Sequence, residues 1–427
     1  MKIVEYKITP IAFGDPPVRA AFGLHAPYAL RTVVEIVSDD GLTGVSETHG
    51  GAAVVNDLEA VRDLVIGRDP FQLAELEHLI WGGSRGDGTS KPWEGKLGSP
   101  PRTFGAIEVA CLDMIGKALG RPVCDLLGGR VRDRVPFSAY LFYKHAGAGG
   151  PWAFANDPGA TGGWPAARQR EALSAETLVE QAQAMVAAFG FESLKLKAGV
   201  LPPDEEVRTI RLLREAFGPD TPLRIDPNTA WSLETSLRVA RELEGLLEYY
   251  EDPVAGRQAM GELAKQTALP LATNMCCVSF ADLPETIRLG SVQIILGDHH
   301  FWGGLSASVE LARICRTWGI GLSMHSNSHL GISLAAMTHL AAAVPNLTYA
   351  CDTHYPWQSD EVIVGGKLEF AGGALAVPAG PGLGVELDHA ALDRLHQLYL
   401  ASGLQFRDDE AEMQKVEPGW KAMLPRW

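Results

Sequence analysis

The feature that most constrains this chain is a series of short apolar segments between residues 195 and 325, each ending in polar side chains. The polar ends are Lys195-Leu196-Lys197, Asp226-Pro227-Asn228, Glu251-Asp252-Pro253, Asn274, Asp298 and His325. Each segment is rich in leucine or β-branched residues and is soon followed by a helical pattern. The interval from 226 to 251, or from 251 to 274, fits about one strand-loop-helix unit. Polar groups that recur once per unit, always at the strand end, predict the catalytic face of a barrel.

We predict eight strands that alternate with seven helical patterns and form an α/β fold, a modified TIM barrel of the type (β/α)7β. The strands are expected at Val135–Phe142, Glu192–Lys197, Leu223–Asp226, Leu247–Glu251, Pro270–Asn274, Val292–Asp298, Gly321–His325 and Leu347–Asp352. The helical patterns are clearest at residues 175–188, 205–216 and 305–318. No strong amphipathic pattern directly follows the eighth strand, so a full eighth repeat is not expected.

The chain is longer than a barrel alone requires. It has 427 residues, whereas a plain barrel needs roughly 250. Residues 1–130 contain alternating strand patterns and then helical patterns, which predict an N-terminal α+β capping domain. We expect the barrel domain at residues 131–357, and a C-terminal segment at 358–427 that packs back on the capping domain. Loops 82–101 and 146–172 are long enough to be lids near the catalytic face.

Composition excludes several classes of partner. The formal net charge of −15 gives no basic stripe for nucleic acid, so an anionic substrate would need a local cluster of cations. No window approaches the ~20 apolar residues of a membrane span, and the first residues lack the apolar run of a signal peptide. The six cysteines show no metal-binding spacing and most lie in apolar runs. Reduced thiols and a cytoplasmic location are therefore expected.

Asp226, Glu251 and Asn274 offer three oxygen ligands from three consecutive strand ends. Any one of them alone is more simply interpreted as a helix cap or a surface group. Three in register favour a hard cation, and Mg²⁺ in particular, which prefers oxygen ligands and completes its octahedron with water or substrate oxygens.

Lys195 and Lys197 alternate with leucines, so both ammonium groups point to the same side of their strand. Two neighbouring cations are expected to lower each other's pKa, which would make a lysine a usable base near neutral pH. A solvated edge strand is the alternative, and the long flanking helical patterns disfavour it.

His325 and Asp298 end the seventh and sixth strands, so the carboxylate could orient the imidazole as in a His-Asp dyad. His329 suggests a metal-binding histidine pair on a helix, but the intervening segment is typical of a strand end and turn. Bases on strands two and seven, with a metal on strands three to five, suit removal of the proton beside a carboxylate. The metal and a lysine would then stabilise the enediolate that forms.

Because of these strand-end motifs, the whole chain resembles the enolase superfamily, and within it the glucarate dehydratase subgroup. Asparagine as the third metal ligand is the more specific mark. Outside the barrel strand ends, similar runs are His25-Ala26-Pro27-Tyr28, Asp352-Thr353-His354 and Arg407-Asp408-Asp409. The resemblance implies Mg²⁺-dependent dehydration of a six-carbon diacid sugar, D-glucarate or L-idarate, to 5-dehydro-4-deoxy-D-glucarate.

The resemblance also implies a role for each site residue. His325 or Lys197 would take the C5 proton, and Asp298 would support His325. Lys195 and Asn228 would stabilise the enediolate and the bound substrate. The implied substrate-binding residues are His25, Tyr140, Ser326, His354 and Arg407. A homo-oligomer is expected, without nucleic-acid or membrane partners.

Several positions depart from the subgroup's usual pattern and leave alternatives open. These positions are Ala198, Thr229, His299 and Ser328. None is an acid-base group or a metal ligand, so they affect the expected substrate rather than the reaction. The alternatives are a dehydratase of another acid sugar such as galactarate, and a non-catalytic relative that binds an acid sugar. His354 and Arg407, which suit a diacid, disfavour a racemase or a cycloisomerase.

Overall fold

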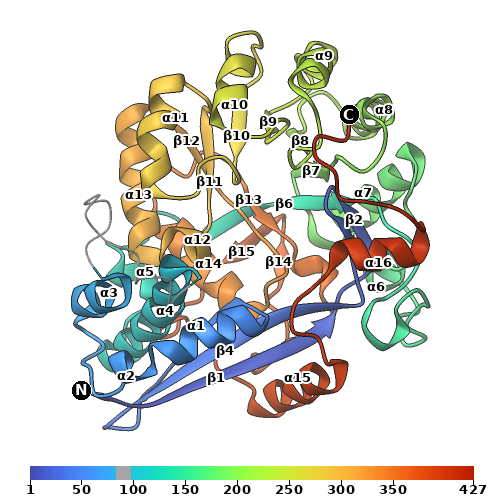
Figure 1. Ribbon diagram of the computed structural model, residues 1–427. Coiled ribbons are helices and arrows are strands. Elements are labelled where there is room, and N and C mark those ends of the chain that lie inside the picture. The colour runs from blue at the N-terminus through green and yellow to red at the C-terminus, as the bar shows by residue number, and fades with distance from the viewer. Residues whose placement is uncertain (83–97) are drawn as a thin grey trace.

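The computed structural model describes residues 1–82 and 98–427, and its N-terminal part is built on an antiparallel sheet (Figure 1). The sheet consists of β1 (Ile3–Gly14), β4 (Tyr28–Ser38) and β5 (Thr43–His49), in the order β1-β4-β5. The helices that accompany it are α1 (Ala52–Ala60), α2 (Arg62–Val65), α3 (Leu73–Trp81) and α4 (Pro100–Leu119). Sheet and helices share an apolar core in which Ile36, Leu76 and Ile107 are fully buried. The predicted α+β capping unit is therefore present.

Eight parallel strands form the barrel. They are β6 (Arg134–Phe142), β7 (Ser193–Lys197), β8 (Leu223–Asp226), β9 (Tyr249–Glu251), β10 (Leu271–Thr273), β11 (Ile294–Gly297), β12 (Gly321–Met324) and β13 (Cys351–Thr353). Each pairs with its predecessor from β7 to β12, and β13 pairs with β6. The amide of Thr348 donates to the carbonyl of Leu322 and joins the last two strands.

The strands alternate with seven major helices. These are α7 (Ala175–Phe189), α8 (Pro203–Phe217), α9 (Leu233–Leu243), α10 (Arg257–Ala264), α11 (Leu283–Leu289), α13 (Leu305–Trp318) and α14 (Gly331–Ala343). The short 3-10 turn η3 (Tyr355–Trp357) directly follows β13, in the place where an eighth barrel helix would begin. The predicted (β/α)7β pattern is confirmed, with strand ends that differ by up to four residues from those expected.

Local sequence explains where the helices begin and end. The hydroxyl of Ser174 accepts from the amide of Thr177, and the Thr177 hydroxyl accepts from the amide of Ser174, so α7 begins with a capping box. The same helix ends at Gly190, whose φ of 72° lies in the left-handed region that glycine adopts without strain. Such ends leave short loops, which hold the strand tips close together.

The C-terminal segment contacts both larger units. Helix α15 (His389–Ser402) packs against β1, where the ring of His396 contacts the carbonyl of Pro10 at 2.7 Å (Figure 1). Helix α16 (Asp409–Val416) packs against β3 (Gly23–His25), which pairs with β2 (Val18–Ala20). The hairpin of β14 (Phe370–Ala371) and β15 (Ala374–Ala376) instead extends the barrel sheet at β6. The segment thus completes the capping unit and also covers the barrel, and the boundaries at 130 and 357 stay a prediction.

The long loop at residues 146–172 has more structure than expected. It contains the 3-10 turn η1 (Gly150–Trp152) and helix α6 (Gly163–Ala167), and Lys144 pairs with Ala172 across its base. Of the other predicted lid, residues 83–97 lie outside the described residues. All six cysteines are buried and free. A search of the described helices finds none with both the length and the apolar character to cross a membrane.

Candidate active site

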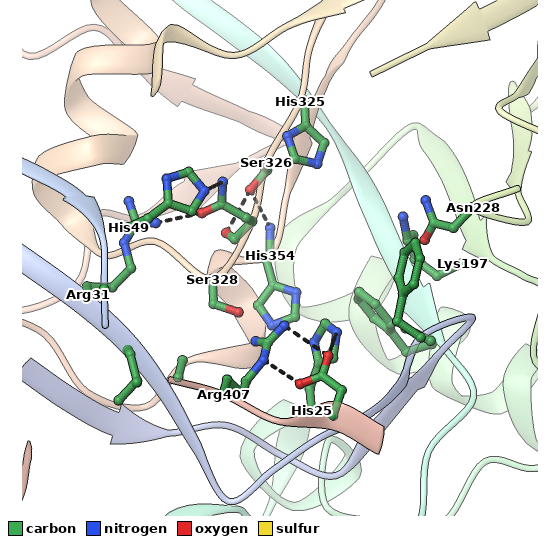
Figure 2. A pocket seen from close by; sticks show the side chains of 18 of the residues that line it. His25, Arg31, His49, Lys197, Asn228, His325, Ser326, Ser328, His354 and Arg407 are labelled. Atoms are coloured by element: carbon green, nitrogen blue, oxygen red, sulfur yellow. Dashed lines mark hydrogen bonds and ion pairs between the residues drawn. The ribbon is translucent and has the colours of Figure 1, made fainter. Parts of the chain in front are cut away.

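A cavity of about 850 Å³ opens where the barrel mouth meets the N-terminal and C-terminal segments (Figure 2). The barrel contributes Lys197, Asn228, Asn274 and His325 to its lining. The five residues predicted to bind substrate also line it: His25, Tyr140, Ser326, His354 and Arg407. Figure 2 shows that Lys197 and His325 approach the cavity from different sides. Residues far apart in the sequence are therefore brought together in one place.

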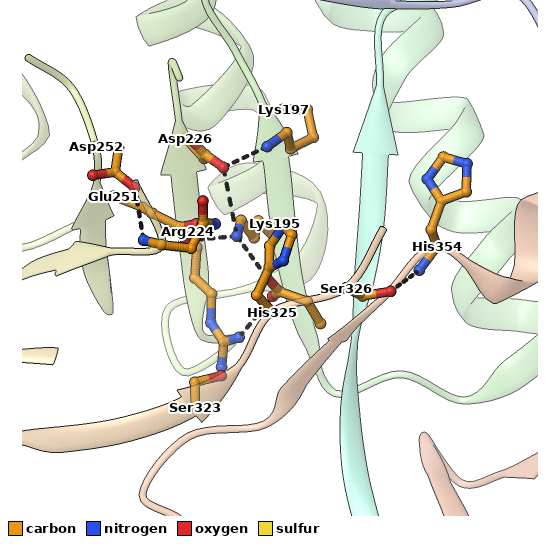
Figure 3. Close-up of polar contacts among 12 residues, drawn as sticks. Lys195, Lys197, Arg224, Asp226, Glu251, Asp252, Ser323, His325, Ser326 and His354 are labelled. Carbon is orange, nitrogen blue, oxygen red and sulfur yellow. Dashed lines mark hydrogen bonds and ion pairs between the residues drawn. The ribbon is translucent and has the colours of Figure 1, made fainter. Parts of the chain in front are cut away.

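The two lysines of β7 lie at different depths. Lys195 is completely buried, and its Nζ lies 2.5 Å from Glu251 Oε2 and 2.7 Å from Asp352 Oδ2. Lys197 is 8% exposed, and its Nζ donates to Asp226 Oδ2 at 2.5 Å (Figure 3). Lys197 is therefore the lysine that can contact a substrate, whereas Lys195 lies deeper in the barrel and supplies a fixed positive charge.

The expectation that the two lysines lower each other's pKa is wrong for Lys195. Burial alone would lower the pKa of Lys195, but the charges of Asp352 and Glu251 outweigh it and raise the pKa well above its usual value. The sequence pattern showed the neighbouring ammonium group but not these carboxylates on other strands. Lys195 consequently stays protonated and is suited to stabilise negative charge rather than to accept a proton.

Asp226, Glu251 and Asn274 come from the ends of β8, β9 and β10 and lie side by side. The Asn274 amide donates to Glu251 Oε1 at 2.7 Å, and Lys195 Nζ lies between the two carboxylates, 3.6 Å from Asp226 Oδ2 (Figure 3). Asp226 is held by the main-chain and side-chain amides of Asn228, at 3.0 and 2.9 Å. The three predicted metal ligands therefore converge, as their spacing suggested.

The residues present fit a hard divalent cation. All three offer oxygen, and Oε2 of Glu251 is buried with an ammonium nearby but accepts no hydrogen bond of good geometry from residues 1–82 or 98–427. Burial and the neighbouring charge of Asp226 raise the pKa of Glu251 well above its usual value, because the nearby ammonium groups do not balance the buried carboxylates. Next to the ligands, Asp252 accepts from the hydroxyl of Thr273 and from the main-chain amide of Asn274. These bonds fix the end of β10.

His325 and Asp298 form the predicted pair. His325 Nδ1 lies 2.9 Å from Asp298 Oδ2, and Asp298 Oδ1 lies 2.7 Å from His300 Nδ1. Burial alone would raise the pKa of Asp298, but His300 and His325 outweigh it and hold that pKa well below its usual value. Asp298 is therefore a carboxylate at neutral pH, and it orients His325 so that the other ring nitrogen is left for proton transfer.

Asp298, His299 and His300 also bring possible metal-ligand atoms within 4.8 Å of one another. Since both His300 and His325 already contact the carboxylate of Asp298, we interpret this group as the support of the dyad. His299 was a departure from the expected pattern, and its ring contacts the ring of His300, with centroids 3.9 Å apart and planes tilted by 34°.

Arg31 is a site residue that sequence reasoning missed. It lies on β4, is 2% exposed, and donates from Nε to Glu47 Oε1 at 2.8 Å. Its Nη1 donates to the side chain of Asn327 at 2.8 Å, and its Nη2 lies 3.1 Å from His300 Nε2. A cation inside an otherwise apolar strand was the available signal. Arg31 thus ties the capping unit to the loop that carries His325.

Asp15 was also missed, because a lone carboxylate before two prolines carries no motif. It is fully buried, with Oδ1 3.3 Å from His354 Nε2 and Oδ2 3.7 Å from Arg407 Nη1. Ser328 donates to the same carboxylate at 3.2 Å. Burial alone would raise the pKa of Asp15, but the bond to His354 and the nearby cations lower it to about 2. Asp15 therefore holds two of the expected substrate-binding side chains in place.

The remaining predicted side chains differ in character. Burial and the charge of Arg407 lower the pKa of His25 to about 4, so this ring is neutral near pH 7 and contacts Asp409 at 3.3 Å. The ring of Tyr140 lies 5.0 Å from Lys195 Nζ and 5.6 Å from Lys197 Nζ, and its buried hydroxyl has no hydrogen-bond partner within residues 1–82 and 98–427. Ser326 accepts from the amide of His354 at 3.0 Å and joins β12 to β13.

The fold and the site together define a class of protein, and comparison with known families identifies that class. Residues 177–391 match the enolase C-terminal domain-like family, and residues 5–128 match the N-terminal domain of the mandelate racemase and muconate lactonizing enzyme family. The chain belongs to the enolase superfamily, and it is an enzyme of that superfamily.

Individual proteins and solved structures are similar to the chain over its full length. The chain is 46% identical to a Streptomyces coelicolor protein named probable glucarate dehydratase, over 100% of this chain and 99% of that protein. An enolase from Mycobacterium smegmatis, solved with tartrate, is 50% identical with a TM-score of 0.90 and covers 100% and 98% of the two chains. An enolase from Pseudomonas fluorescens, solved with magnesium, potassium and tartrate, is 48% identical with a TM-score of 0.90, over 100% and 99%.

Proposed function

We propose that this enzyme dehydrates a diacid sugar, with D-glucarate as the first substrate to test and L-idarate as its C5 epimer. The reaction removes the proton beside one carboxylate and expels the hydroxyl from the next carbon, which yields 5-dehydro-4-deoxy-D-glucarate. The observation that carries the proposal is the arrangement of the cavity. Lys197 and the His325-Asp298 pair reach it from different strands, beside three convergent oxygen ligands.

The ligand set supports a Mg²⁺ requirement. Asp226, Glu251 and Asn274 would hold the ion, and Mg²⁺ supplies positive charge that stabilises the enediolate formed when a carbon acid beside a carboxylate loses its proton. The Pseudomonas fluorescens relative was solved with magnesium, which agrees with this assignment. Lys195 adds a permanent positive charge directly behind the same ligands.

Lys197 and His325, which both face the cavity, would carry out proton transfer. Lys197 or His325 would remove the C5 proton, according to the configuration at C5, because they approach from different sides. His325 would then donate a proton to the departing C4 hydroxyl. Asp298 keeps the imidazole oriented and stabilises its charged form throughout. Asn228, fixed by Asp226, would donate to the bound substrate.

Local cations make the cavity suitable for a dianion despite the acidic chain. Arg407 lines the side of the cavity formed by the C-terminal segment, and a guanidinium binds a carboxylate with two parallel hydrogen bonds. His25, His354, Tyr140 and Ser326 supply further hydrogen-bonding groups around it. Both tartrate-bound relatives were solved with a small diacid, which supports this class of ligand.

The test is to incubate the purified protein with D-glucarate and Mg²⁺ and to measure 2-keto acid formation. Parallel reactions with L-idarate and galactarate separate the possible substrates. We expect turnover of D-glucarate that disappears when a chelator removes the metal and returns when Mg²⁺ is added. Turnover of galactarate alone would replace glucarate by that sugar, and binding without turnover of any acid sugar would contradict the proposed dehydration.

A further inference from the structure

A second cavity, of about 800 Å³, lies outside the catalytic site. It is bordered by the 146–172 loop, the end of α7, the turn η3 and residues 359–370. Four aromatic rings line it: Trp164, Phe189, Tyr355 and Phe370. Phe370 meets both Phe189 and Tyr355 edge to face, with centroids 6.1 and 6.3 Å apart. The cavity therefore has the aromatic wall that an aromatic ligand would pack against.

Two cations border this cavity without a carboxylate partner. Arg168 is 4% exposed, and its Nη1 donates to the carbonyl of Trp357 at 2.6 Å. Lys367 is partly buried, and its Nζ donates to the carbonyls of Tyr355 and Gln358 at 2.7 and 2.6 Å. In the part of the chain that the structure describes, neither cation lies within ion-pair distance of an acidic side chain. Buried lysines and arginines are normally paired, so this is an unusual arrangement in a chain of net charge −15.

Of the acidic groups around these cations, Asp360, Glu361 and Asp157 have other partners. Asp360 pairs with Arg394 at 2.9 Å, and Glu361 accepts from the amides of Gly331 and Val362 and from the hydroxyl of Tyr355. Asp157, which also lines the cavity, accepts from the amide of Gly159 at 2.8 Å, and Glu369 stands exposed at the rim. Burial, which the charge of Glu361 offsets only in part, lowers the pKa of Lys367 to about 7. A bound anion would restore the pairing that these cations lack.

A polar group beside the cations points to a ligand as well. The side chain of Gln358 borders the cavity and is 3% exposed, and neither its amide nitrogen nor its carbonyl oxygen has a hydrogen-bond partner within residues 1–82 and 98–427. A buried primary amide without partners is costly. A rotation of this side chain toward the cavity would let the nitrogen donate to a carboxylate and the oxygen accept from a hydroxyl.

We propose that this second cavity binds a small aromatic carboxylate, with its ring against Trp164, Phe189 and Phe370 and its carboxylate directed to Lys367, Arg168 and Gln358. Benzoate is the simplest molecule of this class, and a hydroxybenzoate adds a donor for the Gln358 oxygen. Trp357 lies between Pro356 and Gln358 of this lining in the sequence, and its indole donates at 2.9 Å to the carbonyl of Tyr140, which lines the catalytic cavity. Among residues 1–82 and 98–427, no residue lines both cavities.

The test measures binding to the full chain by saturation-transfer NMR and calorimetry. We expect benzoate to bind saturably, and acetate and benzyl alcohol, which lack the ring or the charge, to bind at least about tenfold more weakly. Equal affinity for benzyl alcohol, or no saturable binding of benzoate, would overturn the proposal. Excess tartrate should leave benzoate bound, since displacement would place benzoate in the catalytic cavity instead.

Variants locate the bound molecule. Lys367→Met removes one cation and should weaken benzoate binding about tenfold, whereas Lys265→Met, the same change at an exposed lysine directly after α10, should leave it unchanged. Because Lys367 also holds two carbonyls, Ala188→Phe provides an independent variant: Ala188 is exposed at the end of α7 and lines the cavity, so a ring there should block entry. Unchanged benzoate affinity in folded Ala188→Phe protein would contradict the assignment.

Discussion

At the scale of single residues, the site is built from charged groups held by partners that lie far away in the sequence. Lys195 is surrounded by carboxylates from three other strands, and Asp15 holds His354 and Arg407. Sequence spacing predicted which side chains would meet at the barrel mouth and that His325 would pair with Asp298, but not the carboxylates around Lys195 or the partners of Asp15. The pKa of Lys195 illustrates the difference, since burial lowers it but the charges of Asp352 and Glu251, on other strands, outweigh burial and raise it.

The role of His325 gives the first prediction. Replacing His325 by Asn keeps a side chain of similar polarity but removes the group that exchanges a proton, so kcat should fall about a hundredfold or more. Mg²⁺ affinity, measured by calorimetry, should stay the same, because His325 contacts Asp298 and none of the proposed ligands. His389→Asn, at an exposed histidine of α15, is the matched control and should retain full activity. Full turnover of the His325 variant would remove this residue from the mechanism.

At the scale of helices and strands, the sequence predicted most of what positions the site. The strand at 193–197 lies within its expected range, and α13 begins and ends where its pattern predicted. These elements could be predicted because hydrophobic periodicity is a local property of the sequence. In addition, repeated βα units can be arranged in only a few ways. The hairpin of β14 and β15 could not, because short strands in a glycine-rich run show no period and pair with β6 over a long sequence separation.

His339 gives a prediction at this scale, because it joins three elements. It lies on α14, its Nε2 donates to the carbonyl of Leu383 at 3.1 Å, and its Nδ1 accepts from the amide of Cys124 at the start of α5 (Val123–Leu126). Burial, only partly offset by the Leu383 bond, lowers the pKa of His339 from 6.5 to about 4. The unfolded chain therefore binds a proton before the folded chain does. The stability gained from neutral His339 is complete above pH 6.5 and is lost as the pH falls toward 4.

The measurement is the free energy of unfolding in denaturant at pH 7.5 and pH 5. His339 should account for about 2 kcal/mol of the loss between these pH values, so His339→Gln should show a correspondingly smaller loss. His389→Asn, at the exposed ring, should show the same pH dependence as the unaltered protein. An unchanged pH dependence in His339→Gln would mean that this ring does not couple folding to proton binding.

At the scale of the whole molecule, the cavity exists only because three parts of the chain meet. The barrel supplies Lys197 and His325, the groups proposed to transfer protons, the N-terminal unit supplies His25 and Arg31, and the C-terminal segment supplies Arg407. The sequence resemblance predicted that His25 and Arg407 bind substrate. It did not predict a buried ion pair within the N-terminal unit whose two side chains also contact the barrel. That pair is between Arg31 and Glu47, whose side chains are 2% and 0% exposed.

The Arg31–Glu47 pair does more than join two strands of one sheet. Glu47 accepts from the amides of Leu330 and Ser333 at 2.8 and 3.0 Å, so it joins the N-terminal unit to the start of the barrel helix α14. Arg31 at the same time contacts Asn327 and His300, the second of which contacts Asp298. The contact between the two units is therefore continuous with the support of His325, the proposed catalytic histidine, and stability and catalysis should respond together.

A double-mutant cycle tests this coupling. Arg31→Met leaves the Glu47 carboxylate buried without its cation and should lower the free energy of unfolding by about 3 to 5 kcal/mol, with a parallel fall in kcat. Glu47→Gln leaves Arg31 unpaired in the same way. In the double variant neither charge is stranded, so its loss should be smaller than the sum of the single losses by about 1 to 3 kcal/mol. Additive losses, measured by denaturant unfolding, would show that the two side chains act independently and would contradict the proposed coupling.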